Sequence, residues 1–134
     1  MSQTQEANYD PSFTNLVSDV CNKLGLETSL VRAVAPILIQ NLITLEMKQR
    51  DYGPHNLTKF GTFGVIVRMG DKMERIVNLS KKAGSLGLAY GMVGHKTLDA
   101  STHNEPLADS FLDLANYALI AYVMQQNLWP DESR

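Results

Sequence analysis

Residues 107–124 read LADSFLDLANYALIAYVM, and this stretch decides how the chain folds. At helical spacing Asp109, Asp113 and Asn116 share one stripe, and the other sides of the predicted helix are apolar. A helix that is apolar nearly all round is normally buried. Because an isolated buried charge is very costly, the two carboxylates need a metal ion, a basic side chain or a bound ligand as partner. The stretch therefore predicts a site.

Helical patterns also cover most of the chain before this stretch. Apolar residues recur at helical spacing over 11–24, 28–50 and about 62–82. Asp10 followed by Pro11 marks the first helix start, and Thr102 with Glu105 forms a capping box before the last helix, which runs to about residue 126. A strand is the competing interpretation of residues 63–67, which include three β-branched side chains.

The remaining segments are predicted to be connections. They are a loose arm at 1–9, a turn-rich loop at 51–56, a long Gly-rich loop at 83–104 and a tail at 128–134. We therefore expect an all-α fold. It would be a single helical domain of residues 1–134, a bundle of about four helices with the long Gly-rich connection before the last one.

Composition narrows the functional classes. The 134 residues carry a formal net charge of −2, which argues against a broad duplex-DNA footprint. The chain contains no uninterrupted run of about 18 apolar residues, so the sequence predicts no membrane span. The first residues do not form a signal-peptide core. Cys21 is the only cysteine, which fits a reducing, cytoplasmic setting and a packing role.

Charged residues from three predicted helices can converge on one cleft. The predicted metal ligands are Glu46, Asp71, Asp109 and Asp113. Such oxygen-rich groups suit Mg²⁺, and adjacent basic side chains suit phosphate oxygens. Glu46 and Asp113 are the candidate catalytic residues, acting through a metal-held water. The predicted substrate-binding residues are Tyr52, Asn56, Arg68, Lys72, Arg75, Asn116 and Tyr117.

Each acidic residue also has a purely structural interpretation. Asp71 and Arg75 can form an i,i+4 surface pair worth a few tenths of a kcal/mol. Asp109 lies near a helix N-terminus, where the helix dipole alone favours an acid. A buried ion network that fixes helix register is the structural alternative for the whole group.

The order of these motifs resembles a phage protein family, the nucleotide-modification-associated domain one family. The motifs span roughly residues 40–124, and they are the segments DYG at 51–53, FGV at 63–65, DK at 71–72, NL at 78–79 and DLANYA at 113–118, with Asn56, Arg68, Arg75 and Asp109. The resemblance implies a helical protein of phage nucleotide metabolism, in the cytoplasm of the infected bacterium if the chain is phage-encoded.

The arrangement is also similar to the all-α nucleotide pyrophosphohydrolases of the MazG and dimeric dUTPase type. That similarity implies Mg²⁺-dependent cleavage of a nucleoside triphosphate to the monophosphate and pyrophosphate. This chain departs from the pattern at two positions. Those enzymes carry a second Glu where this chain has Gln49, and on a later helix they carry a Glu where this chain has Ser110.

Three functions follow from the residues and the resemblances. The first is binding, with hydrolysis in the enzymatic version, of a nucleoside phosphate with Mg²⁺ in a cleft between helices. The second is a non-catalytic nucleotide binder, such as a sponge, which the missing second Glu favours. The third is a structural subunit whose polar stripe is an oligomer interface. The apolar last helix predicts a homo-oligomer under every interpretation.

Overall fold

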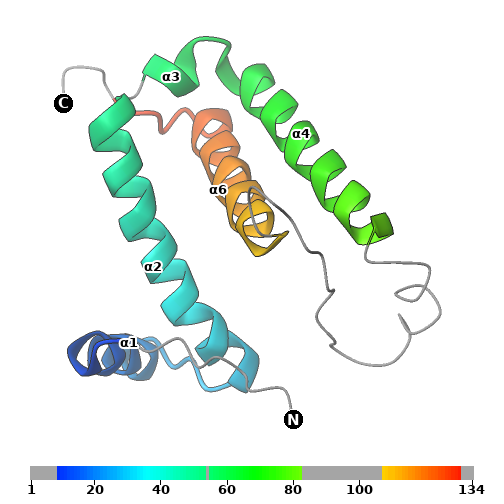
Figure 1. Ribbon diagram of the computed structural model, residues 1–134. Coiled ribbons are helices and arrows are strands. Elements are labelled where there is room, and N and C mark those ends of the chain that lie inside the picture. The colour runs from blue at the N-terminus through cyan, green and yellow to red at the C-terminus, as the bar shows by residue number, and fades with distance from the viewer. Residues whose placement is uncertain (1–8, 54, 83–106, 131–134) are drawn as a thin grey trace. The chain divides into compact units, whose positions relative to one another are not determined.

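The computed structural model describes residues 9–53, 55–82 and 107–130, and over these ranges the chain forms helices and no strand. The helices are α1 (Pro11–Lys23), α2 (Ser29–Tyr52), α3 (His55–Thr58), α4 (Gly61–Lys82) and α6 (Leu107–Gln125) (Figure 1). The all-α prediction is confirmed. The predicted loose arm, the loop at 83–104 and the end of the tail lie mostly outside the described residues.

The chain divides into two compact units, residues 1–47 and 48–134. The boundary falls inside α2, so the last turns of this helix belong to the second unit. The single domain and the four-helix bundle stay predictions.

In the first unit, α1 begins and ends where the sequence predicts. The backbone N–H of Ser12 donates to Asp10 Oδ1 at 2.9 Å, and this bond holds the pKa of the Asp10 carboxyl below its ordinary value. At the other end Gly25 adopts φ +69°, and the N–H of Leu26 donates to the Cys21 carbonyl at 2.9 Å. This is the pattern of a Schellman cap, which favours glycine at the left-handed position.

One arginine fixes the turn between α1 and α2. Arg32 Nε donates to the Leu26 carbonyl at 2.7 Å, and its Nη2 donates to Asn22 Oδ1 at 2.5 Å. Val17 and Cys21 are the buried side chains of α1, in agreement with a packing role for the cysteine.

The prediction of a loop over residues 51–56 is wrong in length, because helices cover part of this range. Asp51 and Tyr52 complete α2, and α3 begins at His55. Gly53 ends α2 with φ +71°, and its N–H donates to the Gln49 carbonyl at 2.9 Å. A single left-handed glycine is sufficient to stop a helix. The turn-forming composition therefore marks a short break between α2 and α3 that begins at Gly53.

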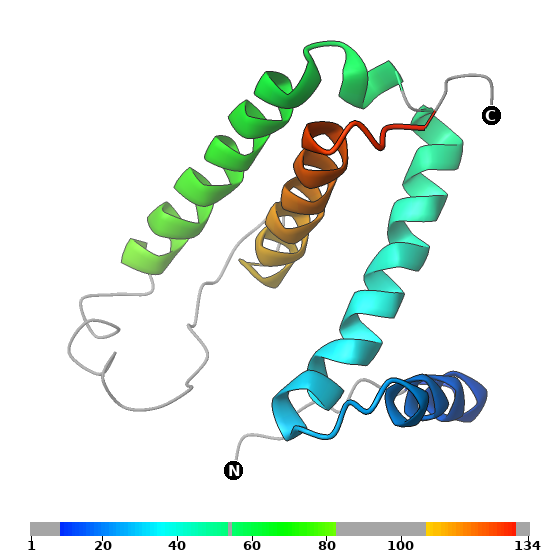
Figure 2. The same ribbon diagram turned by 180° about the vertical axis from the view of Figure 1, so that it is seen from behind.

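The second unit is built on α4 packed against α6 (Figures 1 and 2). Contacts pair Arg75 with Ser110 and Lys72 with Asp113, and residues 61–62 line one cavity with Met124. Each step toward the start of α4 thus matches a step toward the end of α6, so the two helices run antiparallel. The competing strand at 63–67 is not formed, because the segment lies within α4.

The α4–α6 interface is apolar near its ends. Ile76, Leu79 and Leu107 form a buried cluster, and Leu114 packs against it. Val65 and Ile120 are also buried, at positions nearer the other end of the pair. Burying such side chains contributes roughly 1.5–3 kcal/mol each, which makes these clusters the main source of stability in this unit.

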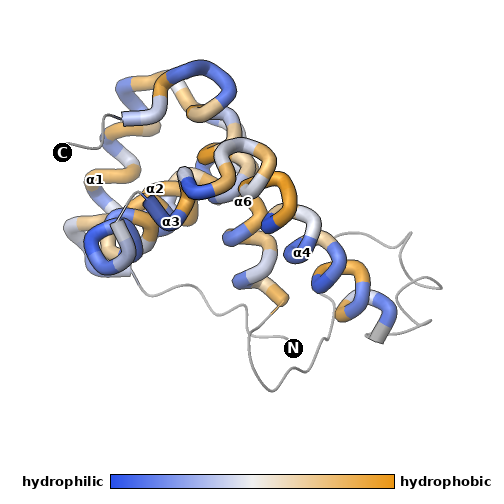
Figure 3. The backbone as a smooth tube through the Cα atoms, turned by 90° about the horizontal axis from the view of Figure 1, so that it is seen from above, coloured by the Kyte–Doolittle hydropathy of each residue, from blue (hydrophilic) through white to orange (hydrophobic). Residues whose placement is uncertain are grey.

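The face of α4 that packs inward differs from the predicted one. The sequence predicts an apolar stripe of Ile66, Met69, Met73, Ile76 and Val77 and a polar stripe on the opposite side. In the structure Ile66, Met73 and Val77 are exposed, whereas Arg68, Lys72 and Arg75 are half-buried. Figure 3 shows polar and apolar residues alternating along α4. The helix is therefore apolar on more than one side, and periodicity alone does not select the packed face.

The last helix is also less buried than expected. One face of α6 packs on α4, but Phe111, Leu119 and Tyr122 are 49%, 47% and 63% exposed. The physical reason is that the described part of the second unit supplies one long partner helix, which covers only one side. The remaining apolar surface is the kind that normally marks an interaction site.

Two helices, α2 and α6, are long and apolar enough to cross a membrane when judged by length and composition alone. Neither helix is an uninterrupted apolar run, because Arg32 lies within α2 and Asp109 and Asp113 lie within α6. Core helices of soluble proteins and N-terminal signal segments can have the same length and composition. The cytoplasmic location stays a prediction.

We predict that Leu79→Ala lowers the free energy of unfolding by about 2–4 kcal/mol, because it leaves a cavity in the buried cluster. Urea denaturation followed by circular dichroism at low protein concentration measures this. Leu119→Ala makes the same chemical change on the exposed side of α6 and should cost less than about 0.5 kcal/mol. Equal losses for the two variants would contradict the packing described above.

Candidate functional site

The middle of the α4–α6 interface is polar. Lys72 Nζ lies 2.7 Å from Asp113 Oδ2, and Arg75 Nη1 donates to Ser110 Oγ at 2.9 Å. Lys48, the first residue of the second unit, places its Nζ 3.7 Å from Asp113 Oδ1. The partner that the sequence requires for the Asp113 carboxylate is therefore basic, and two lysines supply it.

Burial makes these contacts stronger than ordinary surface pairs. Ser110 is fully buried and Asn116 is 8% exposed, while the side chains of Lys72 and Asp113 are each 21% exposed. Water screens such half-buried charges less than surface charges. Removing one partner leaves the other charge poorly solvated, which costs more than the pair itself contributes.

Several basic side chains converge at this centre. Arg68, Lys72 and Arg75 follow one another along the inner side of α4, and Lys48 joins them from α2. Lys48 and Lys72 both contact the Asp113 carboxylate. We call the set of Lys48, Arg68, Lys72, Arg75, Ser110 and Asp113 the basic centre. A concentration of basic side chains suits an anion.

Arg68 links the basic centre to α3. Its Nη2 donates to Asn56 Oδ1 at 3.5 Å, so two predicted substrate-binding residues lie together. Tyr52 is 69% exposed at the end of α2, and Tyr117 is half-buried on α6. The structure thus brings Arg68 and Asn56 together, and it brings Lys72 and Arg75 against α6.

The predicted metal ligands are not gathered in the same way. Asp71 and Asp109 are exposed, and Glu46 belongs to the first unit. Over the described ranges, no group of three or more His, Cys, Asp or Glu side chains is placed to hold a metal ion. The donors seen at the basic centre fit an anion better than a cation, because Asp113 is paired with two lysines. Mg²⁺ therefore stays a prediction.

Asp71 and Arg75 lie instead at an outer cavity of α4. This cavity has a volume of about 550 Å³, and its lining also includes Glu74, Asn78 and Lys81. Both signs of charge are present there, so it has no clear preference for an anion or a cation. Arg75 is the residue that this cavity shares with the basic centre.

Ser110 and Lys48 were not among the predicted site residues, and Ser110 was noted only as a departure from the pyrophosphohydrolase pattern. The predicted polar stripe of α6 ran through Asp109, but the buried residue is its neighbour Ser110. The signal was spacing, because Ser110 lies three residues before Asp113 and three after the buried Leu107. Lys48 had no comparable signal, since an exposed lysine near a helix end is common.

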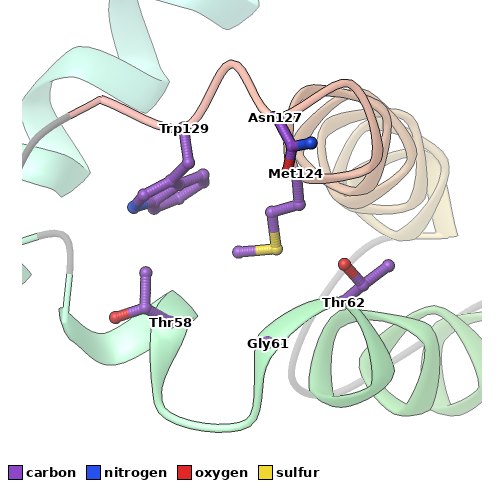
Figure 4. Close-up of a pocket in the computed structure, with 6 residues that line it drawn as sticks. All are labelled: Thr58, Gly61, Thr62, Met124, Asn127 and Trp129. Carbon is purple, nitrogen blue, oxygen red and sulfur yellow. The ribbon is translucent and has the colours of Figure 1, made fainter.

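A second cavity lies at the other end of the α4–α6 pair. Its volume is about 290 Å³, and its lining residues are Thr58, Gly61, Thr62, Met124, Asn127 and Trp129 (Figure 4). Trp129 belongs to the segment that the sequence assigns to a tail, yet it is half-buried and forms part of this wall.

Comparisons with protein-family models, with curated proteins and with solved structures give no match. The resemblances described from the sequence motifs therefore stay predictions.

We predict that Ser110→Ala lowers the free energy of unfolding by about 1–3 kcal/mol, because it removes a buried acceptor from a half-buried guanidinium. Ser80→Ala is the matched control, since the Ser80 hydroxyl donates within its own helix to the Ile76 carbonyl at 2.6 Å. A double-mutant cycle of Ser110→Ala with Arg75→Met, measured by urea denaturation, should show clear coupling. Additive losses would contradict a direct role of this bond.

Proposed function

We propose that this protein binds a nucleoside phosphate and that the basic centre holds the phosphate groups. The observation that carries the proposal is the convergence of basic side chains on the middle of the α4–α6 interface, where Lys48 and Lys72 contact Asp113 and Arg75 donates to Ser110. An anionic ligand with several oxygens matches a cluster of this kind. The nucleoside part of the proposal rests on the sequence resemblance to phage proteins of nucleotide metabolism.

Each residue of the basic centre has a distinct part in holding phosphate. The planar guanidinium of Arg75 can grip two oxygens at once, and its bond to Ser110 fixes its direction. Lys72 and Lys48 act as compact charges, and Asp113 holds them together when no ligand is bound. Arg68 extends the positive surface toward Asn56 and α3.

The described geometry favours a binder in which cations contact phosphate directly. We derive no hydrolytic step, because the acidic residues that would hold Mg²⁺ are not gathered over the described ranges. The non-catalytic nucleotide binder is therefore the version that we put forward. The alternative is metal-dependent hydrolysis, and the Asp113→Asn experiment below distinguishes the two.

The exposed apolar side of α6 supports a second role, self-association. Phe111, Leu119 and Tyr122 lie on the surface in a single chain, where a homo-oligomer would cover them. This role is compatible with nucleotide binding, because it uses a different side of the helix from the basic centre.

We predict that Lys72→Met and Arg75→Met each weaken binding of deoxynucleoside triphosphates by about ten- to hundredfold. Hydrogen bonds to charged groups contribute about 1.5–3 kcal/mol, which corresponds to that range. Isothermal titration calorimetry with and without Mg²⁺ measures the change. Lys23→Met removes a lysine of α1 and should leave the affinity unchanged. An equal loss in this control would contradict the assignment of the phosphate site.

Asp113→Asn separates a binder from a metal-dependent hydrolase. In a binder, removing this carboxylate leaves more positive charge for the ligand, so triphosphate affinity should rise severalfold. In a hydrolase that uses Asp113 as a metal ligand, Mg²⁺-dependent release of monophosphate would be present in the parent protein and lost in the variant. Turnover by the parent that disappears in Asp113→Asn would overturn the non-catalytic proposal.

A further inference from the structure

We infer that the cavity beside Trp129 is a binding site for a planar heteroaromatic ring and takes the base of the nucleotide. We call this cavity the Trp129 cavity. The identity of the ligand rests on the proposed function, but the site itself is distinct from the basic centre. Its lining comes from α3, α4, α6 and the segment that follows α6.

The walls of the Trp129 cavity have the chemistry of a stacking site. Met124 lines it from the end of α6 and Trp129 from the segment that follows, while Thr58 lines it from the end of α3 and Gly61 and Thr62 from the start of α4 (Figure 4). Base–aromatic stacking is strong and tolerates every base, and a polarizable thioether makes favourable contacts with aromatic rings. The Thr62 hydroxyl and the Asn127 amide supply hydrogen-bonding groups for the edge of a ring, whereas the Thr58 hydroxyl donates to the His55 carbonyl of its own helix at 3.4 Å.

The indole nitrogen gives an independent reason to expect a function. Trp129 Nε1 is buried and has no hydrogen-bond partner among the residues that the structure describes. A buried donor without an acceptor is costly, and a phenylalanine would fill much of the same space without that cost. The chain therefore carries a stability penalty at a cavity wall. Tryptophan provides a larger aromatic surface for stacking than phenylalanine would, and this is a functional reason for its presence at position 129.

The backbone around Trp129 is also specialised. Asn127 adopts φ +54°, its N–H donates to the Met124 carbonyl at 3.1 Å, and the N–H of Leu128 donates to the Val123 carbonyl at 3.0 Å. This cap ends α6 and turns the chain at a defined angle. The indole is thereby held by a structured turn, which is what a pre-formed binding site requires.

The size and position of the Trp129 cavity fit one ring system of a longer ligand. A volume of about 290 Å³ is at the lower limit for small-molecule pockets, so the ligand must extend beyond it. Thr62 and Lys72 are ten residues apart on α4, which is roughly 15 Å along a helix. An extended nucleoside triphosphate has a length similar to this distance. Arg68 lies between Thr62 and Lys72 on α4.

The chain offers a direct optical test, because Trp129 is its only tryptophan. Adenosine, guanosine, cytidine and thymidine are titrated separately into the full-length protein, and tryptophan fluorescence is followed. N-acetyl-tryptophanamide is titrated in parallel to correct for absorption. At least one nucleoside should quench the emission saturably, whereas ribose and inorganic tripolyphosphate should not. Absence of saturable quenching with all four nucleosides would overturn the inference.

Variants locate the effect. Trp129→Ala should weaken binding of the preferred nucleoside triphosphate by about five- to hundredfold while leaving tripolyphosphate affinity unchanged. Met124→Ala should act in the same direction, and Met73→Ala, on the exposed side of α4, should change neither affinity. Unchanged triphosphate affinity in Trp129→Ala would overturn the inference.

The two proposals fail in distinguishable ways. Lys72→Met should lose tripolyphosphate binding and keep nucleoside quenching. Nucleoside quenching without tripolyphosphate binding in the parent would remove the phosphate site and leave the base site standing. Tripolyphosphate binding without nucleoside quenching would remove the base site and leave the phosphate site standing.

Discussion

The second unit depends on one constraint, the need to place Asp113 between two helices without leaving its charge unpaired. The carboxylate lies on the inner side of α6, and Lys72 of α4 meets it at 2.7 Å. The same register that lets Lys72 face Asp113 brings Arg75 to the buried Ser110 and joins Leu79 to Leu107 in one apolar cluster. We infer that the charge pair helps to select this packing, because α4 also carries apolar side chains on its exposed side.

The same constraint connects structure to function. Lys48 and Lys72 meet the Asp113 carboxylate in a partly water-excluded place. Under the proposed function, bound phosphate oxygens would take over contacts that Asp113 provides in the free protein. The apolar clusters at the ends of the interface would then hold the helices together while the polar middle changes partners.

The presence of the helices could be predicted from the sequence, but the use of their faces could not. Asp10, Pro11 and Gly25 act locally, so the limits of α1 follow from neighbours in the chain. The inner face of α4 depends on Asp113, a residue more than thirty positions away, and the apolar side formed by Ile66 and Met73 looked like the better core. The length of the loop near Gly53 was overestimated. Turn-forming residues indicate that the chain changes direction there, but they do not indicate how many residues lie outside the helices. For the site, Asp113 and Asn116 of the predicted polar stripe lie on the inner side of α6, but Asp109 is exposed and its neighbour Ser110 is buried instead. Both Asp109 and Ser110 are compatible with helical spacing to the later polar residues, so spacing alone did not decide between them.

The basic centre has a practical consequence for handling the protein. The chain as a whole is slightly acidic, with a formal net charge of −2, yet it holds a local concentration of the opposite sign. Sulfate and phosphate in a purification buffer resemble the ligand chemistry that this centre favours, and anything that binds only the native state adds to its stability. Melting temperatures recorded in chloride and in phosphate would then describe two different states of ligation of one protein.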